Sequence, residues 1–281
     1  MPRIPRTQIL SDLHTLIENG TLILGAGAGS GLTAKSAAQG GADLLIVYNS
    51  GRFRMAGAGS LAGLLPYGDA NAIMMDMARE ILPTIARLDE PVPVLAGVCG
   101  TDPFREMEGF LRQVLATGFS GVQNFPTVGL IDGKFRAALE ETGMGFSEEV
   151  KMIETAANMG FLTAPYVFNV DQAEMMAKAG ADIIVAHMGL TMGGNIGAKT
   201  GMGLDDCVRI IQDVRDAAVT IKRDVIVLCH GGPIAEVESA QYILEKTKGV
   251  HGFFGASSME RLPVETAVME NAQRFKSIDM S

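Results

Sequence analysis

Two stretches near the C-terminal end decide how this chain folds: residues 225–233, VIVLCHGGP, and residues 250–263, VHGFFGASSMERLP. Each is a short apolar run that stops at glycines and polar side chains. A buried parallel strand that presents functional groups at its carboxyl end has this pattern. About one helix of sequence separates the two stretches, which predicts the last two strands of an α/β fold, the (β/α)8 or TIM barrel.

A repeated phrase supports the barrel. The tripeptide GAD occurs at residues 41–43 and again at 180–182, each time after a helical segment and before an apolar run. Repetition at the same structural point is typical of a βα-repeat architecture. The pattern predicts eight strands alternating with helices in one domain over residues 1–281. Residues 1–20 form a short N-terminal helix that caps the barrel, and residues 21–281 form the barrel itself.

The connection after the second predicted strand, residues 49–69, is rich in glycine. We expect a long loop without secondary structure that covers a site, because such loops are uncommon elsewhere. Arg52 and Arg54 lie in this loop, where a solvent-facing charge is the default interpretation. The helix that follows, residues 70–88, contains Pro83 and is expected to kink or break there.

Three other connections carry specific expectations. Asp102 precedes Pro103 at the predicted first position of a helix. The fifth strand, residues 161–168, contains Pro165 and should be short or bulged. The last helix, residues 263–275, is expected to pack on the outside of the barrel.

Composition limits the function classes. The formal net charge is -9 with no basic stripe, which argues against a nucleic-acid or anionic-membrane binder. The three cysteines lie far apart without metal-ligand spacing, and they predict reduced thiols of a cytoplasmic protein. No apolar run is long enough to span a bilayer.

Polar side chains close several predicted strands, and catalytic residues of barrel enzymes come from such positions. His187 and His230 end adjacent predicted strands, and a glycine follows each of them within two residues. They could act as general acid and base or bind an anionic substrate; alternatively, backbone groups satisfy both imidazoles, or the pair binds a metal. The remaining strand-end candidates are Asn49, Asp102, Asn124, Tyr166, Ser257 and Ser258.

Glycines and serines at the last two strand ends suggest an anion site. Gly231, Gly232, Ser257 and Ser258 offer N–H and hydroxyl donors for a phosphate or carboxylate. The alternative is that the glycines only permit tight turns. Arg261 either clamps the anion or pairs with the neighbouring Glu260 to seat the last helix.

The phrases at residues 123–133, 186–191, 229–233 and 252–263 together resemble the phosphoenolpyruvate hydrolase-like family, also called the TIM-barrel signal transduction family. This resemblance implies a TIM barrel related to the phosphoenolpyruvate mutase and isocitrate lyase group, with members named phosphonopyruvate hydrolase. It also implies a homo-oligomer. Fold alone does not fix the reaction.

The mutase group is similar at Asn49, Ser50 and Gly51, which the resemblance therefore implies as substrate-binding residues, and in a gating segment at residues 59–71. That group binds Mg²⁺ through paired aspartates after the third strand and a glutamate after the fourth. Here the fourth strand ends at Asn124, and Asp102 is the one carboxylate that could stand in. Magnesium stays an open alternative, although the usual ligands are largely absent.

Two hypotheses follow. The first is a hydrolase or lyase that acts on a small anionic 2-oxo acid or phospho-carboxylate at the C-terminal face of the barrel, with His230, His187 and Asp102 as candidate catalytic residues. The second is a non-catalytic barrel that senses a metabolite or binds a partner protein.

Overall fold

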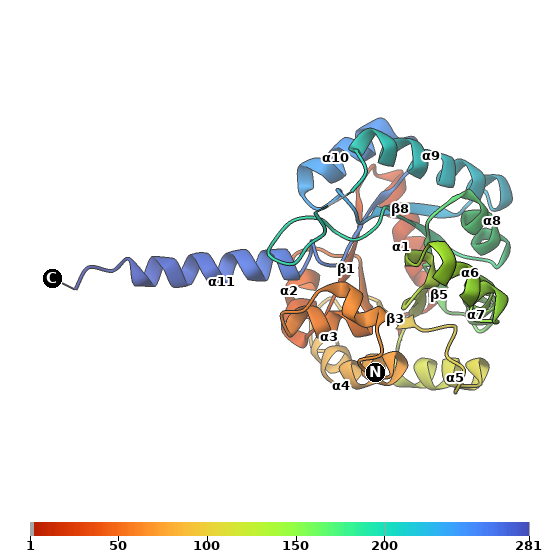
Figure 1. The fold of residues 1–281 in the computed structure, drawn as a ribbon, viewed down its shortest axis with the longest axis horizontal. Helices are drawn as coiled ribbons and strands as arrows, with labels where there is room; N and C mark the ends of the chain where they lie inside the picture. Colours follow the sequence, from red (N-terminus) through yellow and green to blue (C-terminus); the bar gives the residue numbers. More distant parts are fainter. Residues whose placement is uncertain (1–2, 200, 281) are drawn as a thin grey trace.

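A computed structural model describes residues 3–199 and 201–280 and shows a ring of parallel strands surrounded by helices (Figure 1). The strands are β1 (Ile23–Gly27), β2 (Leu44–Val47), β3 (Val94–Val98), β4 (Gly121–Asn124), β5 (Leu162–Thr163), β6 (Tyr166–Val167), β7 (Ile183–His187), β8 (Ile226–His230) and β9 (Gly252–Gly255). They follow the order β5-β4-β3-β2-β1-β9-β8-β7-β6.

The α-helices are α1 (Arg6–Glu18), α2 (Gly31–Gln39), α3 (Asn49–Met55), α4 (Ala70–Ile85), α5 (Met107–Thr117), α6 (Gly133–Glu141), α7 (Phe146–Asn158), α8 (Val170–Lys178), α9 (Leu204–Ile221), α10 (Val237–Lys246) and α11 (Arg261–Lys276). Two short 3-10 helices, η1 (Ser60–Leu64) and η2 (Val128–Leu130), lie in the connections.

The ring closes through a strand that proline divides in two. β5 pairs with β4, and β6 pairs with β7, so residues 162–167 occupy one position between them. Proline has no N–H to donate to a ladder, and Pro165 accordingly separates the two halves. Its carbonyl still accepts from the amide of Val185 at 2.9 Å. Eight strand positions form the barrel, as the sequence predicted, and the expected interruption at Pro165 is confirmed.

The GAD phrase has the same structural role at both sites. Asp43 accepts a hydrogen bond from the amide of Leu24 at 2.8 Å, and Asp182 accepts from the amide of Thr163 at 3.1 Å. Each aspartate thus fixes the start of its own strand against the strand before it. Asp182 is fully buried and also forms an ion pair with Arg6 of α1 at 2.6 Å, which secures that helix to the barrel.

Apolar side chains fill two regions. One lies between the strands and the surrounding helices, and the other fills the barrel interior with residues such as Ile46, Leu95 and Leu228. Ile9 and Leu13 of α1 belong to the interior cluster. The short N-terminal helix therefore closes the amino-terminal end of the barrel, as predicted.

Residues 49–69 are not the structureless loop that we expected. α3 begins directly after β2, and η1 follows it. The side-chain amide of Asn49 donates to the carbonyl of Gly63 at 2.9 Å and joins the two helices. Gly51 lies in α3 and Gly63 lies in η1. Gly63 lets the two helices pack closely, because a Cβ there would lie 2.9 Å from the Cβ of Ser50.

Two helices differ from their expected bounds: α4 has no break at Pro83, and α5 starts later than predicted. α4 runs through Pro83 and ends at Ile85. The proline lies in the last turn of the helix. It has no N–H, so the only hydrogen bond lost is the one to the carbonyl of Arg79, an exposed residue. α5 begins at Met107 and not beside Asp102, because the Glu106 side chain accepts from the amides of Glu108 and Gly109 and caps the helix there.

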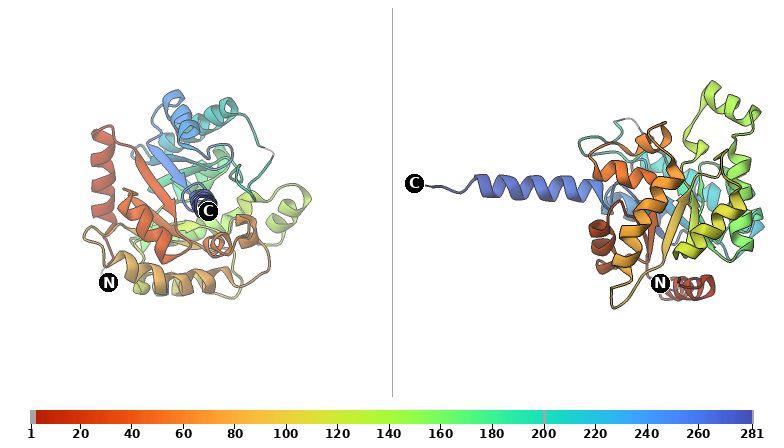
Figure 2. Two further views of the ribbon diagram at one scale, coloured as in Figure 1. Left: turned by 90° about the vertical axis from the view of Figure 1, so that its left-hand side faces the viewer. Right: turned by 90° about the horizontal axis from the view of Figure 1, so that it is seen from below.

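The last helix does not pack on the barrel. α11 extends away from the rest of the molecule (Figures 1 and 2). Its residues from 263 onward are exposed except for the half-buried Glu265. Val264, Val268 and Phe275 recur at helical spacing on one face of this helix, and all three are exposed.

The three cysteines, Cys99, Cys207 and Cys229, are free thiols. Within residues 3–199 and 201–280, no helix combines the length and the apolar character needed to cross a membrane.

We predict that Leu13→Ala lowers the free energy of unfolding by about 2 to 5 kcal/mol, because it leaves a cavity in the barrel interior. Urea denaturation measures this change. Ser11→Ala, at an exposed position of the same helix, should stay within about 0.5 kcal/mol of the parent protein. Equal losses for the two variants would show that α1 does not close the interior.

Candidate active site

A small cavity of about 30 Å³ lies at the carboxyl ends of the strands. Its lining residues come from the ends of β6, β7 and β8, from α3 and η1, and from the segments that follow β2, β4, β7 and β9. The polar residues that line it are Tyr48, Ser50, Arg54, Ser60, Tyr166, His187, Thr191, His230 and Ser257. This mouth of the barrel contains both predicted histidines and three further predicted site residues, Ser50, Tyr166 and Ser257.

The two histidines are direct neighbours. His187 and His230 pair across β7 and β8, and their ring centroids lie 4.5 Å apart in an edge-to-face arrangement. Both side chains are buried. Burial lowers the pKa of His230 to about 4 and, together with the neighbouring histidine, lowers the pKa of His187 well below its usual value. At neutral pH both imidazoles are therefore uncharged.

Backbone contacts assign opposite tautomers to the pair. Nδ1 of His230 contacts the carbonyl of Phe254, which can only accept, so this nitrogen carries the hydrogen. Nδ1 of His187 accepts from the amide of Gly189 at 3.0 Å, so here the hydrogen is on Nε2. Nε2 of His187 is a donor and Nε2 of His230 is an acceptor. The backbone thus satisfies one nitrogen of each ring and leaves the other for a ligand.

Tyr166 positions both rings. Its ring centroid lies 4.7 Å from that of His187 and 4.8 Å from that of His230. Its hydroxyl lies 3.5 Å from that of Tyr48. Burial raises the pKa of both tyrosines, which keeps their hydroxyls protonated.

Arg54 is the charged group of this cavity, and the prediction that it faces solvent is wrong. Its Nε donates to Oε1 of Glu260 at 2.6 Å. Its Nη1 donates to the hydroxyl oxygens of Ser50 at 3.0 Å and Ser60 at 3.2 Å. Ser60 and Ser257 lie 3.1 Å apart through their hydroxyl oxygens. Arg52, by contrast, is exposed, as expected, and pairs with Asp76 on the surface.

The sequence contained one signal for Arg54 that loop reasoning missed. If α3 starts at Asn49, Ser50 and Arg54 are four residues apart and share a helix face. The glycines around them favoured a loop, and the partner Glu260 lies more than 200 residues away along the chain.

Other predicted residues lie outside the cavity. Gly231 and Gly232 have φ of 76° and 59°, and the Gly232 amide donates to the carbonyl of Gly189 at 2.8 Å. These glycines permit a tight turn, which is the alternative interpretation. Ser258 lies outside the lining. Gly51 packs against Gly29, where a Cβ on Gly29 would meet the Gly51 carbonyl at 2.3 Å.

Arg261 is also directed elsewhere. It pairs with Glu265 at 3.1 Å and donates to the carbonyl of Gly193 at 3.2 Å. Glu260 pairs with Arg54, so the structure does not form the Glu260–Arg261 pair that was one of the two alternatives.

Comparison with known proteins identifies the family of this chain. Residues 8–278 match the model of a family described as phosphoenolpyruvate hydrolase-like. The chain belongs to this family. It is 60% identical over 275 residues to the ToMV susceptible protein tm-1(GCR26) of Solanum lycopersicum, covering 98% of this chain and 36% of the tomato protein. The phosphoenolpyruvate hydrolase-like chain therefore spans about a third of that relative's length.

Solved structures share the fold. A phosphoenolpyruvate phosphomutase from Streptomyces platensis subsp. rosaceus superposes with a TM-score of 0.61 at 18% identity, over 96% of this chain and 86% of that one. A phosphonopyruvate hydrolase in complex with oxalate and Mg²⁺ gives 0.57 at 16% identity, over 97% and 87% of the two chains. This likeness shows that the chain shares their barrel fold.

The residues present do not fit a magnesium site like that of the mutase group. Oδ2 of Asp102 is occupied by Arg105 and by Nδ2 of Asn71 at 2.9 Å, and Oδ1 accepts from the amide of Phe104 at 3.0 Å. In the described part of the chain, no group of three histidine, cysteine or acidic residues could hold a metal ion.

Asn124 is likewise committed to its neighbours. Its Oδ1 accepts from the amide of Tyr166 at 2.7 Å, and its Nδ2 donates to Glu149 at 2.6 Å. Glu149 also accepts from the amide of Val128 at 2.7 Å. Burial raises the pKa of Glu149 to about 7 against these hydrogen bonds. Asn124 and Glu149 thus support the backbone of Tyr166 beneath the histidines.

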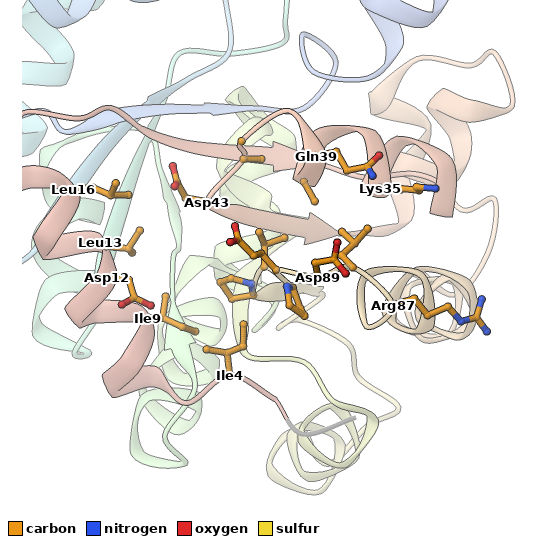
Figure 3. Close-up of a pocket in the computed structure, with 18 residues that line it drawn as sticks. Ile4, Ile9, Asp12, Leu13, Leu16, Lys35, Gln39, Asp43, Arg87 and Asp89 are labelled. Carbon is orange, nitrogen blue, oxygen red and sulfur yellow. The ribbon is translucent and has the colours of Figure 1, made fainter.

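A larger hollow of about 950 Å³ lies at the opposite end of the barrel (Figure 3). It runs between α1, the C-terminal end of α2 and residues 87–93. Its polar groups include Asp12, Lys35, Asp43 and Asp89. The histidine pair is not among its lining residues, and the strands begin here, so the candidate active site is the small cavity at the other end.

We predict that Glu149 makes the protein less stable at pH 8 than at pH 5. A raised pKa means that the unfolded chain loses this proton first, so stability falls as pH rises from 4.5 and the loss is complete above about 7. The shift corresponds to roughly 3 kcal/mol. Urea denaturation at both pH values measures it, and Glu149→Gln should remove this part of the pH dependence. Glu154→Gln, at an exposed position of the same helix, should keep it; parallel profiles for Glu149→Gln and the parent would refute the assignment.

Proposed function

We propose that this chain is an enzyme that acts on a small anionic 2-oxo acid or phospho-carboxylate at the carboxyl-end mouth of its barrel, by hydrolase or lyase chemistry. The observation that carries the proposal is the pair of buried, neutral imidazoles with opposite tautomers. One offers a hydrogen and the other a lone pair, side by side. Acid–base catalysis on a carbonyl compound needs both functions at once.

The roles of the two histidines follow from their tautomers. Nε2 of His187 donates to the carbonyl oxygen of the substrate and stabilises the negative charge that develops there. Nε2 of His230 accepts the proton released by the attacking water or by the group that is cleaved. A neutral His230 is ready to accept a proton at neutral pH because burial holds its pKa near 4. Asp102 is bound to Arg105 and takes no part.

Substrate entry requires the cavity to open. Its volume of about 30 Å³ has room for water but not for a 2-oxo acid. Leu61 of η1 and Leu190 after β7 line the cavity. We infer that η1 moves outward to admit the substrate and then excludes water from the site. This corresponds to the gating segment that the resemblance implied at residues 59–71.

The same closure favours a second candidate function, a non-catalytic barrel that senses a metabolite or binds a partner protein. A closed cavity without a carboxylate cluster is consistent with a ligand switch. Binding of a 2-oxo acid without turnover would support this alternative.

We also infer that the protein forms a homo-oligomer in which a second copy covers α11. Isolated helices of this length are marginal in water, and most helical stability in proteins comes from packing. α11 has 16 residues and exposes two-thirds of Val268 and of Phe275. The free thiols support a cytoplasmic location. The small anionic metabolite remains the proposed ligand; the net charge of -9 gives no basis for a nucleic-acid partner.

For the histidines, we predict that His230→Gln lowers kcat about 10²- to 10⁴-fold on whichever of oxaloacetate, phosphonopyruvate or phosphoenolpyruvate the parent protein converts. His187→Gln should lower kcat by a similar factor. Circular dichroism and the melting temperature check that both variants fold. His14→Gln, in α1 at the opposite end, is the control and should leave kcat unchanged. Unchanged turnover in His230→Gln would contradict the assigned role.

For the assembly, we predict that the double variant Val268→Asp/Phe275→Asp dissociates the oligomer. Sedimentation velocity measures the molar mass directly. Gln273→Asp adds a charge at an exposed polar position of α11 and should leave the assembly intact. A parent protein that sediments as a monomer of 29.7 kDa would refute the proposal.

A further inference from the structure

We propose that the mouth of this barrel binds its anion without a metal ion, through the hydroxyl groups of Ser50, Ser60 and Ser257, which the Arg54–Glu260 pair orients. This inference rests on the proposed function and adds to it the way in which the charge of the substrate is compensated. It departs from the way in which the mutase group holds its substrate, with Mg²⁺, which the sequence left as an open alternative.

The first step is that Glu260 is fixed and fully satisfied. Its Oε1 accepts from Nε of Arg54, and its Oε2 accepts from the amide of Gly29 at 2.6 Å and the hydroxyl of Thr33 at 3.2 Å. The side chains of Arg54 and Glu260 are 1% and 0% exposed. Because the carboxylate is held from several sides, it fixes the guanidinium in one orientation.

The second step concerns the direction of the serine hydroxyls. A guanidinium only donates, so the oxygens of Ser50 and Ser60 accept from Nη1 of Arg54. Ser60 and Ser257 share one hydrogen between them, whichever of the two donates. Of the three hydroxyl hydrogens, one is used in this bond. The other two are available to donate to an anion in the cavity.

The third step is electrostatic. Arg54 lines the cavity, whereas Glu260 does not, so the positive end of the pair faces the cavity. Nη2 of Arg54 is buried and lies 2.5 Å from Oε1 of Glu260, so this nitrogen is paired with the carboxylate, and Nη1 is the nitrogen that reaches the serines. Oriented donors in a site that excludes water stabilise negative charge strongly.

The fourth step is the geometry relative to the histidines. Ser50, Ser60 and Ser257 line the same cavity as His187 and His230. An anionic group held by the serines therefore places the adjacent carbonyl of a 2-oxo acid beside the imidazoles. The guanidinium lies 5.2 Å from the centroid of the Tyr48 ring, which supports it on the strand side.

The test uses oxalate as the probe. Oxalate is a small dianion in which a carboxylate is bonded directly to a second carbonyl carbon, as in a 2-oxo acid. Isothermal titration calorimetry measures its Kd for the full chain in EDTA and again in excess Mg²⁺. We expect the two values to agree within about twofold. The double variant Ser60→Ala/Ser257→Ala should bind oxalate at least tenfold more weakly, whereas Ser36→Ala, an exposed serine of α2, should bind like the parent.

Arg54 acts through the serines, so its variants separate positioning from folding. Arg54→Met and Arg54→Lys both lose the two-pronged contact with Glu260, and the melting temperatures of both should fall. Arg54→Lys keeps a charged donor and should recover much of the oxalate affinity that Arg54→Met loses. Equal affinities for the two variants would show that the residue is merely structural.

The outcomes distinguish this inference from the proposed function. Binding only with Mg²⁺ would overturn the metal-free site and leave the proposed substrate class intact. Binding in EDTA that the serine variants do not weaken, but that His230→Gln weakens, would likewise overturn only the role of the serines. No binding in either buffer, with no change in melting temperature, would overturn both.

Discussion

The buried ion pair of Arg54 and Glu260 is the interaction on which the mouth of the barrel depends. It joins the loop after β1, the helix α3 and the residue that precedes α11, three segments that are far apart in the sequence. Desolvating two charges is costly, and such a pair is stable only when further hydrogen bonds satisfy the remaining polar atoms. Gly29, Thr33, Ser50 and Ser60 supply those bonds, so the pair organises the backbone around it. Loss of either partner would leave the other charge buried and uncompensated.

This arrangement concentrates charge on one side of the cavity and keeps the other side neutral. The imidazoles of His187 and His230 lie among aromatic rings, and burial favours their uncharged forms. The positive charge of Arg54 adds to the depression of the pKa of His230. One cavity therefore combines donors for an anion with a neutral acceptor for a proton. In water, neither the fixed hydroxyl directions nor the fixed tautomers would persist.

The sequence predicted the parts of the site that depend on periodicity. Apolar runs, glycines and the GAD phrase indicated parallel strands, and parallel neighbours bring His187 and His230 together at one edge. It did not predict the tautomers, because these depend on the carbonyl of Phe254 and the amide of Gly189, whose positions only the folded backbone sets. Arg54 was missed because a glycine-rich segment favours a loop locally, whereas in the folded chain this segment is a helix packed against η1 and α4. The direction of α11 was missed because a helix after the last strand normally covers it.

Conservation of the fold does not require conservation of the way charge is compensated. The barrel superposes on a phosphonopyruvate hydrolase at a TM-score of 0.57 with 16% identity, so the two chains share a fold while most of their residues differ. Here the end of β3 gives an aspartate held by Arg105, and the end of β4 gives an amide that supports Tyr166. Each of these groups stabilises its own loop and is unavailable to a cation. Because those positions stabilise the structure, donors from other elements must balance the charge of a bound anion. The helix α3, which carries Arg54, brings a positive charge to the cavity.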